Sequence, residues 1–121
     1  MTVVFISSPL REYELDGETY SQQYNQDQAL NYMKLAIDKG FCPVVPHVMY
    51  PPVLNDHDQE ERIKAIQLCS ELVKRSDEVW FFLKYNYFSS GMMAEMVTAH
   101  EYGRRIRLFT VAVDLIEEVL S

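Results

Sequence analysis

The chain has 121 residues, a formal net charge of −7 and an apolar content of 48%. Its length and apolar content predict one globular domain over residues 1–121 and exclude a disordered chain. The negative charge argues against binding to a nucleic acid polymer or an anionic membrane, although a local arginine can still hold a small anion. Two cysteines without metal-ligand spacing, no signal-peptide pattern and no apolar run of about 20 residues indicate a cytoplasmic protein without a membrane span.

Strand-like and helix-like segments alternate along the chain. Short apolar runs rich in β-branched and aromatic residues predict strands over residues 2–7, 41–45, 77–83 and 105–111. Apolar residues at helical spacing predict helices over residues 26–39, 58–75, 90–102 and 114–120. The polar residues 12–24 are interpreted as a loop or lid, and the proline-rich residues 46–52 as a stiff loop. Pro43 favours an edge position for the second strand.

Two of the predicted helices carry start signals and buried faces. Asp58 followed by Glu61 resembles a capping box, and Ser89 or Ser90 can cap the helix that follows the third strand. The residues expected to be buried on these two helices are Ile63, Ile66, Cys69, Leu72 or Val73, Met92 or Met93, Met96 and Ala99.

This alternation predicts an α/β fold, a three-layer sandwich with a four- to five-stranded, mainly parallel sheet between helices. Four strands are evident, and a fifth is not visible unless residues 50–55 supply it. Eight tyrosines and six phenylalanines leave an aromatic surplus that fits a homo-oligomer.

The stretch from residue 77 to residue 95 is the strongest candidate for a functional site. A strand buried on both faces leads through a short polar loop into a helix start, and open α/β sheets bind ligands at this position. Gly91 allows close backbone approach, and the free N–H groups of the helix start favour an anion. Glu95 falls in the first two turns of this helix and is the candidate catalytic carboxylate, the alternative being a helix-surface glutamate.

Two further candidates follow other strands at the same edge. Arg11 lies in the first strand-to-helix loop, where a guanidinium can pair with phosphate or carboxylate, although it can equally be a surface arginine. His47 follows the second strand, with a structural histidine as the alternative. The chain has no Gly-x-Gly-x-x-Gly, no P-loop and no zinc-binding cluster, so no cofactor and no metal are expected.

Four blocks follow one another along the chain: Val4-Phe5-Ile6-Ser7-Ser8-Pro9-Leu10-Arg11, Pro46-His47-Val48-Met49-Tyr50, Ser76-Asp77-Glu78-Val79-Trp80-Phe81 and Ser90-Gly91-Met92-Met93-Ala94-Glu95. They resemble the nucleoside 2-deoxyribosyltransferases and, more distantly, the deoxynucleoside 5′-monophosphate N-glycosidases. Their order and spacing are similar to those of small relatives of these enzymes in bacteria and phages. The resemblance implies a flavodoxin-like, Rossmann-like fold, a homo-oligomer and a nucleoside or nucleotide as the small-molecule partner.

The resemblance also implies roles for individual residues. Glu95, six residues after Ser89, would be the nucleophile that attacks C1′ of the deoxyribose and expels the base, so that a transferase or a hydrolase results. Arg11 and Ser89 match positions that hold the 5′-phosphate, and His47 matches a histidine of the second loop. The remaining candidates for substrate binding are Ser8, Ser90 and Gly91.

Three positions depart from the family pattern. Phe5 replaces a tyrosine, Pro9 replaces a phosphate-binding serine, and Cys69 replaces an aspartate that handles the leaving base. Loss of this general acid would lower the rate by roughly 10² to 10⁴. Two alternatives to the enzyme are therefore a non-catalytic module that sequesters or senses a nucleotide, and a structural homo-oligomer with a vestigial pocket.

Overall fold

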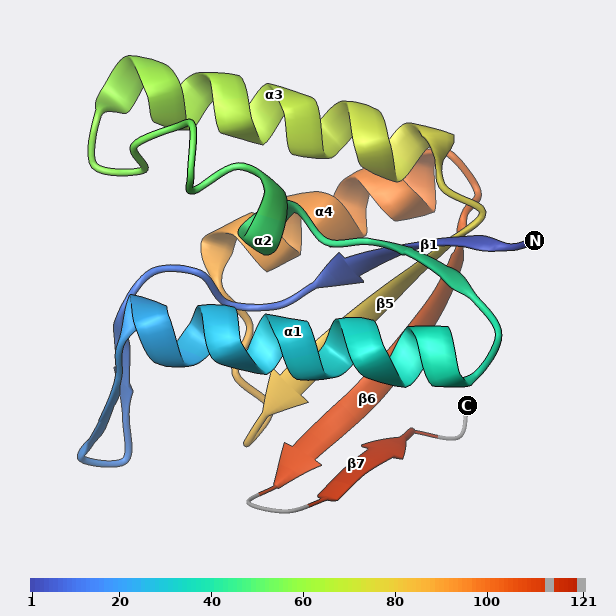
Figure 1. The fold of residues 1–121 in the computed structure, drawn as a ribbon, viewed down its shortest axis with the longest axis horizontal. Coiled ribbons are helices and arrows are strands. Elements are labelled where there is room, and N and C mark those ends of the chain that lie inside the picture. The colour runs from blue at the N-terminus through green and yellow to red at the C-terminus, as the bar shows by residue number, and fades with distance from the viewer. Residues whose placement is uncertain (113–114, 120–121) are drawn as a thin grey trace.

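A five-stranded sheet forms the centre of the protein (Figure 1). The computed structural model describes residues 1–112 and 115–119. The strands lie in the order β4-β1-β5-β6-β7, and all neighbours are parallel except β6 and β7. The α/β fold with a five-stranded, mainly parallel sheet is thus confirmed. The strands are β1 (Val3–Ser7), β4 (Cys42–Val44), β5 (Glu78–Lys84), β6 (Arg105–Ala112) and β7 (Leu115–Glu118).

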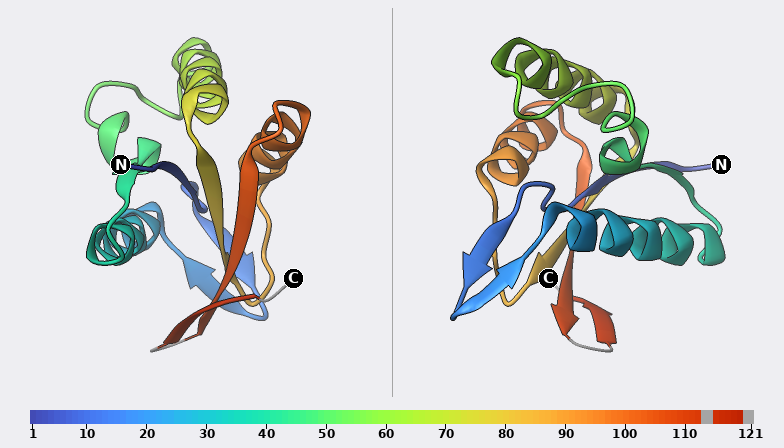
Figure 2. Two further views of the ribbon diagram at one scale, coloured as in Figure 1. Left: turned by 90° about the vertical axis from the view of Figure 1, so that its right-hand side faces the viewer. Right: turned by 60° about the vertical axis from the view of Figure 1, so that its left-hand side comes forward.

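Helices cover both faces of this sheet, which confirms the three layers (Figure 2). The helix α1 (Gln22–Asp38) packs Ala29, Tyr32 and Ala36 against one face. The helices α3 (Gln59–Arg75) and α4 (Ser90–Glu101) pack Val73, Met92 and Ala99 against the other. Because helices cover both faces of β5, its residues from Glu78 to Leu83 are all buried, as the continuous apolar run predicts.

The fifth strand is β7, and the helix predicted over residues 114–120 is wrong for residues 115–118. These residues pair antiparallel with β6, placing Ile116 opposite Val111 and against the core. The guanidinium of Arg107 donates from Nε to Glu118 Oε2 over 2.8 Å. A helix of seven residues has little intrinsic stability, so these pairings decide the outcome. Residues 114 and 120 lie outside the described residues.

The segment predicted to be a loop or lid contains a hairpin. Its strands are β2 (Tyr13–Leu15) and β3 (Glu18–Tyr20), joined by Asp16 and Gly17 with φ angles of 53° and 81°. The Asp-Gly pair is a strong signal for this tight turn, because both central residues need positive φ. Helix α1 then begins at Gln22, four residues earlier than predicted, because Ser21 Oγ accepts a hydrogen bond from Tyr24 N over 3.0 Å.

The part of the chain between β4 and β5 also differs in detail from the prediction. The start of the predicted 46–52 loop is a short helix, α2 (Pro46–Met49), with proline in its first turn. Asp58 caps α3 as predicted, accepting from Glu61 N over 3.1 Å. Ile63 and Ile66 are half-exposed and not buried, because α3 packs on the sheet only through its C-terminal half.

The strand order places a crevice at the carboxyl ends of β1 and β5. Counted along the chain within this sheet, the order is 2-1-3-4-5, which is the flavodoxin-like order. The chain leaves β1 toward β4 on one side and then crosses to β5 on the other. Ser7 at the end of β1 lies opposite Phe81 of β5. In such sheets the loops at this reversal diverge and leave room for a ligand. No helix in the described part of the chain is long and apolar enough to cross a membrane.

Candidate active site

A cavity of about 490 Å³ opens at this reversal point, within the size range of sites for small molecules. The loops after β1 and β5 and the helices α2, α3 and α4 form its wall. Every residue predicted as catalytic or substrate-binding lines it, although the sequence separates these residues widely. The predicted residues that line the cavity are Ser8, Arg11, His47, Ser89, Ser90, Gly91 and Glu95.

Glu95 is a buried carboxyl group with one hydrogen-bond donor. It is 9% exposed, and Ser7 Oγ donates to its Oε1 over 2.6 Å. Burial disfavours the charged form and raises the pKa of Glu95 to about 7, although the hydrogen bond from Ser7 works in the opposite direction. The protonated form of Glu95 therefore persists to higher pH than that of an exposed glutamate.

The register of α4 explains why this carboxyl group points inward. Met92 and Ala99 lie three residues before and four residues after Glu95, so all three share the helix face that packs on the sheet. Ser89 fixes the start of the helix, because its Oγ accepts a hydrogen bond from Met92 N over 3.1 Å. Glu95 is thus buried beside the core and is not a helix-surface glutamate.

The start of α4 offers backbone donors to the cavity. Ser90 and Gly91 are exposed and line the cavity, and the first N–H groups of a helix have no partner within the helix. A Cβ atom at Gly91 would come no closer than 3.9 Å to Ser89 Oγ, so the protein itself leaves room for a side chain there. A glycine at this position leaves the backbone open to close approach by a ligand.

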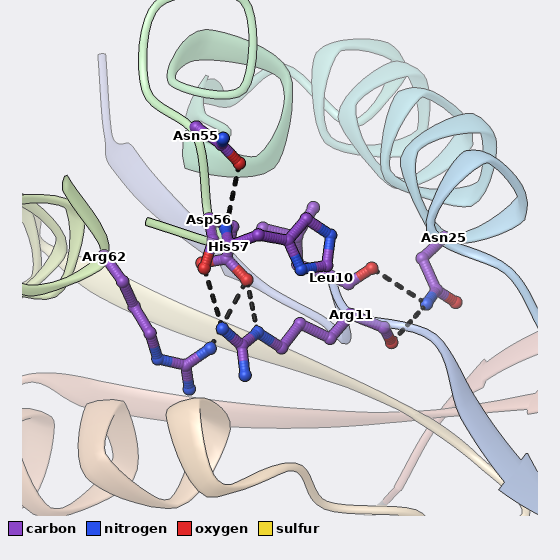
Figure 3. A network of polar contacts seen from close by, with 7 residues as sticks. All are labelled: Leu10, Arg11, Asn25, Asn55, Asp56, His57 and Arg62. Atoms are coloured by element: carbon purple, nitrogen blue, oxygen red, sulfur yellow. Dashed lines mark hydrogen bonds and ion pairs between the residues drawn. The ribbon is translucent and has the colours of Figure 1, made fainter. Parts of the chain in front are cut away.

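The loop after β1 is held from two sides. Asn25 of α1 donates from Nδ2 to the carbonyl oxygens of Leu10 and Arg11 over 3.1 and 3.0 Å (Figure 3). His47 lies 2.6 Å from the carbonyl oxygen of Ser8, which can only accept, so Nε2 of His47 carries the proton. Burial lowers the pKa of His47 against this hydrogen bond, which favours the neutral ring. His47 therefore positions the loop that carries Ser8 and Arg11.

Ser8 is a polar group without a partner in the described structure. Its side chain is 2% exposed and lines the cavity, yet Oγ has no hydrogen bond. A buried hydroxyl left in this state costs free energy, and most such groups in native proteins are paired. The hydroxyl is available to a polar atom of a ligand.

An ion cluster lies at the cavity wall and contains two residues that the sequence did not indicate as site residues. Arg11 donates from Nε to the Asp56 carboxylate and from Nη2 to the Asp56 carbonyl oxygen, the latter over 2.7 Å (Figure 3). Arg62 Nη1 lies 3.3 Å from the same carboxylate. Two guanidinium groups thus share one carboxylate, and Glu12 and Glu61 line the same cavity. Asp56 lies in an irregular segment between α2 and α3, where its spacing in the sequence gives no signal.

Cys69, which the predicted resemblance places at an aspartate position, lines the cavity near Glu95. Burial, with a smaller effect from the Glu95 charge, raises the pKa of the Cys69 thiol to about 12. The group stays a neutral thiol and cannot serve as a strong acid. Nowhere in residues 1–112 and 115–119 do three His, Cys, Asp or Glu side chains form a group that could hold a metal ion.

The fold defines the class of protein: an α/β protein with the fold of the 2-deoxyribosyltransferases. The 2-deoxyribosyltransferase from Bacillus psychrosaccharolyticus superposes with a TM-score of 0.69 at 16% identity, covering 96% of this chain and 77% of that one. The 2-deoxyribosyltransferase from Leishmania mexicana superposes with a TM-score of 0.61 at 15% identity, covering 93% and 66%. These matches confirm the predicted resemblance at the level of the fold.

The family itself is identified from the sequence. The model named "Domain of unknown function (DUF7768)" matches residues 2–109, and the chain belongs to this family. None of the curated proteins matches the chain.

Proposed function

We propose that this protein cleaves or exchanges the N-glycosidic bond of a 2′-deoxynucleoside or its 5′-monophosphate, with Glu95 as the nucleophile. The observation that carries the proposal is the Glu95 carboxyl group, buried in the cavity wall and oriented by Ser7 over 2.6 Å. A carboxylate held in this way can form and release a covalent bond to a sugar carbon. The shared fold adds support.

In the proposed reaction, an ionised Glu95 oxygen attacks C1′ as the bond from C1′ to the base nitrogen breaks. The bonding electrons leave with the base, which takes a proton from solvent. Water, or the nitrogen of a second base, then attacks C1′ and displaces the Glu95 carboxylate. Water gives a free deoxyribose and a second base gives a new nucleoside. Ser7 holds Oε1 of Glu95, and its hydrogen bond favours the charged form of the carboxylate.

Within this proposal, the cavity offers groups suited to the phosphate of a 5′-monophosphate. Arg11 and Arg62 bring two positive charges to one wall and share the Asp56 carboxylate, while Glu12 and Glu61 also line the cavity. The N-terminus of α4 adds backbone donors, and the Ser8 hydroxyl adds an unused polar group. Guanidinium groups and helix N-termini are the usual protein partners of phosphate.

A second candidate function is a binding module that holds the same ligand without turning it over. Cys69 favours it, because a thiol with a pKa of about 12 does not protonate a departing base. Bases that leave readily without protonation would be the best substrates if the enzyme is active. The two candidates differ in what they do to the ligand and not in where they bind it.

The deciding experiment incubates the protein with deoxynucleosides and their 5′-monophosphates and measures free base by chromatography. The enzyme predicts base release that Glu95→Gln abolishes. Glu101→Gln is the matched control, because Glu101 lies exposed at the end of the same helix. Ligand-induced thermal stabilisation with no base release would support the binding module instead. If the protein neither releases base nor is stabilised by these ligands, both candidate functions are overturned.

A further inference from the structure

The loop from β5 to α4 begins with a turn of unusual backbone conformation. Tyr87 N donates to the Lys84 carbonyl oxygen over 3.0 Å, and the two residues between them, Tyr85 and Asn86, have φ angles of 50° and 62°. A tyrosine rarely adopts the left-handed conformation. Such a conformation persists only where the surrounding contacts hold it, and it occurs often at ligand-binding sites.

The β2–β3 hairpin supplies these contacts. Lys84 Nζ lies 4.6 Å from the ring centroids of both Tyr20 and Tyr24 and donates to the Tyr24 hydroxyl. Tyr20 in turn stacks on Tyr13, with ring centroids 5.0 Å apart. The hairpin and the start of α1 therefore surround the Lys84 ammonium group with aromatic rings. This arrangement fixes Lys84, the residue from which the turn starts, to the hairpin and to α1.

The same hairpin packs against the ring of Tyr87 through Tyr13. Tyr13 and Tyr87 stack face to face, with centroids 3.9 Å apart and an angle of 2° between their planes. Tyr13 is buried, whereas Tyr87 is partly exposed and lines the cavity with Ser89 and Glu95. One face of the Tyr87 ring is thus covered by Tyr13, and the ring is fixed at the wall of the cavity.

We infer that Tyr87 is the stacking surface for the flat heteroaromatic ring of the ligand, and that Tyr13 holds it in place. This inference rests on the proposed function and names the part of the cavity that takes the base. In this arrangement Glu95 contacts the sugar, and the cavity wall with Arg11 and Arg62 contacts the phosphate. A base–aromatic stack tolerates different bases, because every base has a π-face. The site would accept both purines and pyrimidines at this contact.

The test compares Tyr87→Leu with the unaltered protein by isothermal titration calorimetry. The probes are dAMP and dTMP, which carry a base, and deoxyribose 5-phosphate, which does not. Loss of the stack should weaken binding of both nucleotides by about 5- to 150-fold, while deoxyribose 5-phosphate binds as before. Tyr87→Phe keeps the ring and should stay within about twofold. Tyr102→Leu is the matched control, because Tyr102 lies exposed at the opposite end of α4.

The inference is overturned if Tyr87→Leu binds dAMP and dTMP as tightly as the unaltered protein does, or if it loses as much affinity for deoxyribose 5-phosphate as for the nucleotides. It is also overturned if the unaltered protein binds no nucleotide. If Tyr87→Leu does not fold, Tyr87→Met also removes the ring and keeps an apolar side chain, and unchanged nucleotide affinity again overturns the inference. Base release is measured separately on the unaltered protein. Nucleotide binding that depends on Tyr87 without any base release would overturn the enzyme and leave the stacking surface standing.

Discussion

Ser7 at the end of β1 donates a hydrogen bond to Glu95 on α4 over 2.6 Å, across 88 positions of the chain. This bond joins the first strand of the sheet to the helix that follows β5, and both partners are buried. It orients the carboxyl group at the cavity wall and opposes the effect of burial on its pKa.

The first prediction concerns stability and pH. Because the pKa of Glu95 rises from 4.5 in the unfolded chain to about 7 in the folded protein, the folded state binds more protons between these values, and stability falls as pH rises through this window. Above pH 7 the cost is complete, at about 3 kcal/mol. Glu95→Gln should therefore be more stable than the unaltered protein at pH 8 by up to this amount, with little of this gain at pH 4.5. Urea unfolding at both pH values measures the difference, and an equal difference at both would contradict the prediction.

The second prediction concerns the pH dependence of base release. An ionised Glu95 is needed for attack, so the rate should rise with pH and reach half of its plateau near pH 7. Ser7→Ala removes a hydrogen bond to the charged form and should move this midpoint to higher pH. Rates of base release across pH 5 to 9 for both proteins check the shift. A midpoint that stays in place, or moves down, would show that Ser7 does not tune Glu95.

The third prediction concerns the ion cluster. Arg11→Gln or Arg62→Gln should weaken binding of a deoxynucleoside 5′-monophosphate by about tenfold and leave the corresponding deoxynucleoside unchanged, because only the former carries a phosphate. Arg75→Gln is the matched control, since Arg75 is exposed on α3 and pairs with Glu71. Calorimetric titration with both ligands measures the effect. An equal loss of affinity for both ligands would show that the cluster does not bind the phosphate.

The fourth prediction concerns the missing acid. Cys69→Asp would place a carboxyl group beside Glu95, where burial and the like charge keep one of the two protonated near neutral pH. If leaving-group protonation limits the enzyme, base release should rise by roughly 10² to 10⁴. The same variant should be less stable than the unaltered protein, because it buries a second ionisable group. A folded Cys69→Asp protein without any gain in rate would favour the binding module.

The sequence predicts the layers of this fold because buried parallel strands and amphipathic helices leave local patterns. The apolar run before Lys84 and the helical spacing of Met92 and Ala99 are such patterns, and the structure confirms both elements. The strand β7 leaves none, because its four residues gain their strand conformation from pairing with β6. The β2–β3 hairpin did leave a signal in Asp16 and Gly17, which the polarity of the surrounding residues obscured.

Part of the candidate site could likewise be predicted from the sequence, and part could not. Its predicted residues follow strands at one edge of a parallel sheet, so topology alone brings them to one cavity. Ser7, Asp56, Arg62 and Tyr87 were not predicted as site residues, because their places depend on tertiary contacts. The only signal for Ser7 is a hydroxyl at the end of an apolar strand. Its side chain lies on the same face of β1 as that of Phe5, which is the face that packs against α4. The roles of the predicted residues and the expected homo-oligomer stay predictions.

The central claim is that the Glu95 carboxylate bonds to the sugar. Mass spectrometry of the protein, quenched with acid during incubation with a deoxynucleoside 5′-monophosphate, tests this claim most directly. We predict an adduct of deoxyribose 5-phosphate on the peptide that contains Glu95, absent from Glu95→Gln. Base release that continues unchanged in Glu95→Gln, or an adduct on another residue, would contradict the claim.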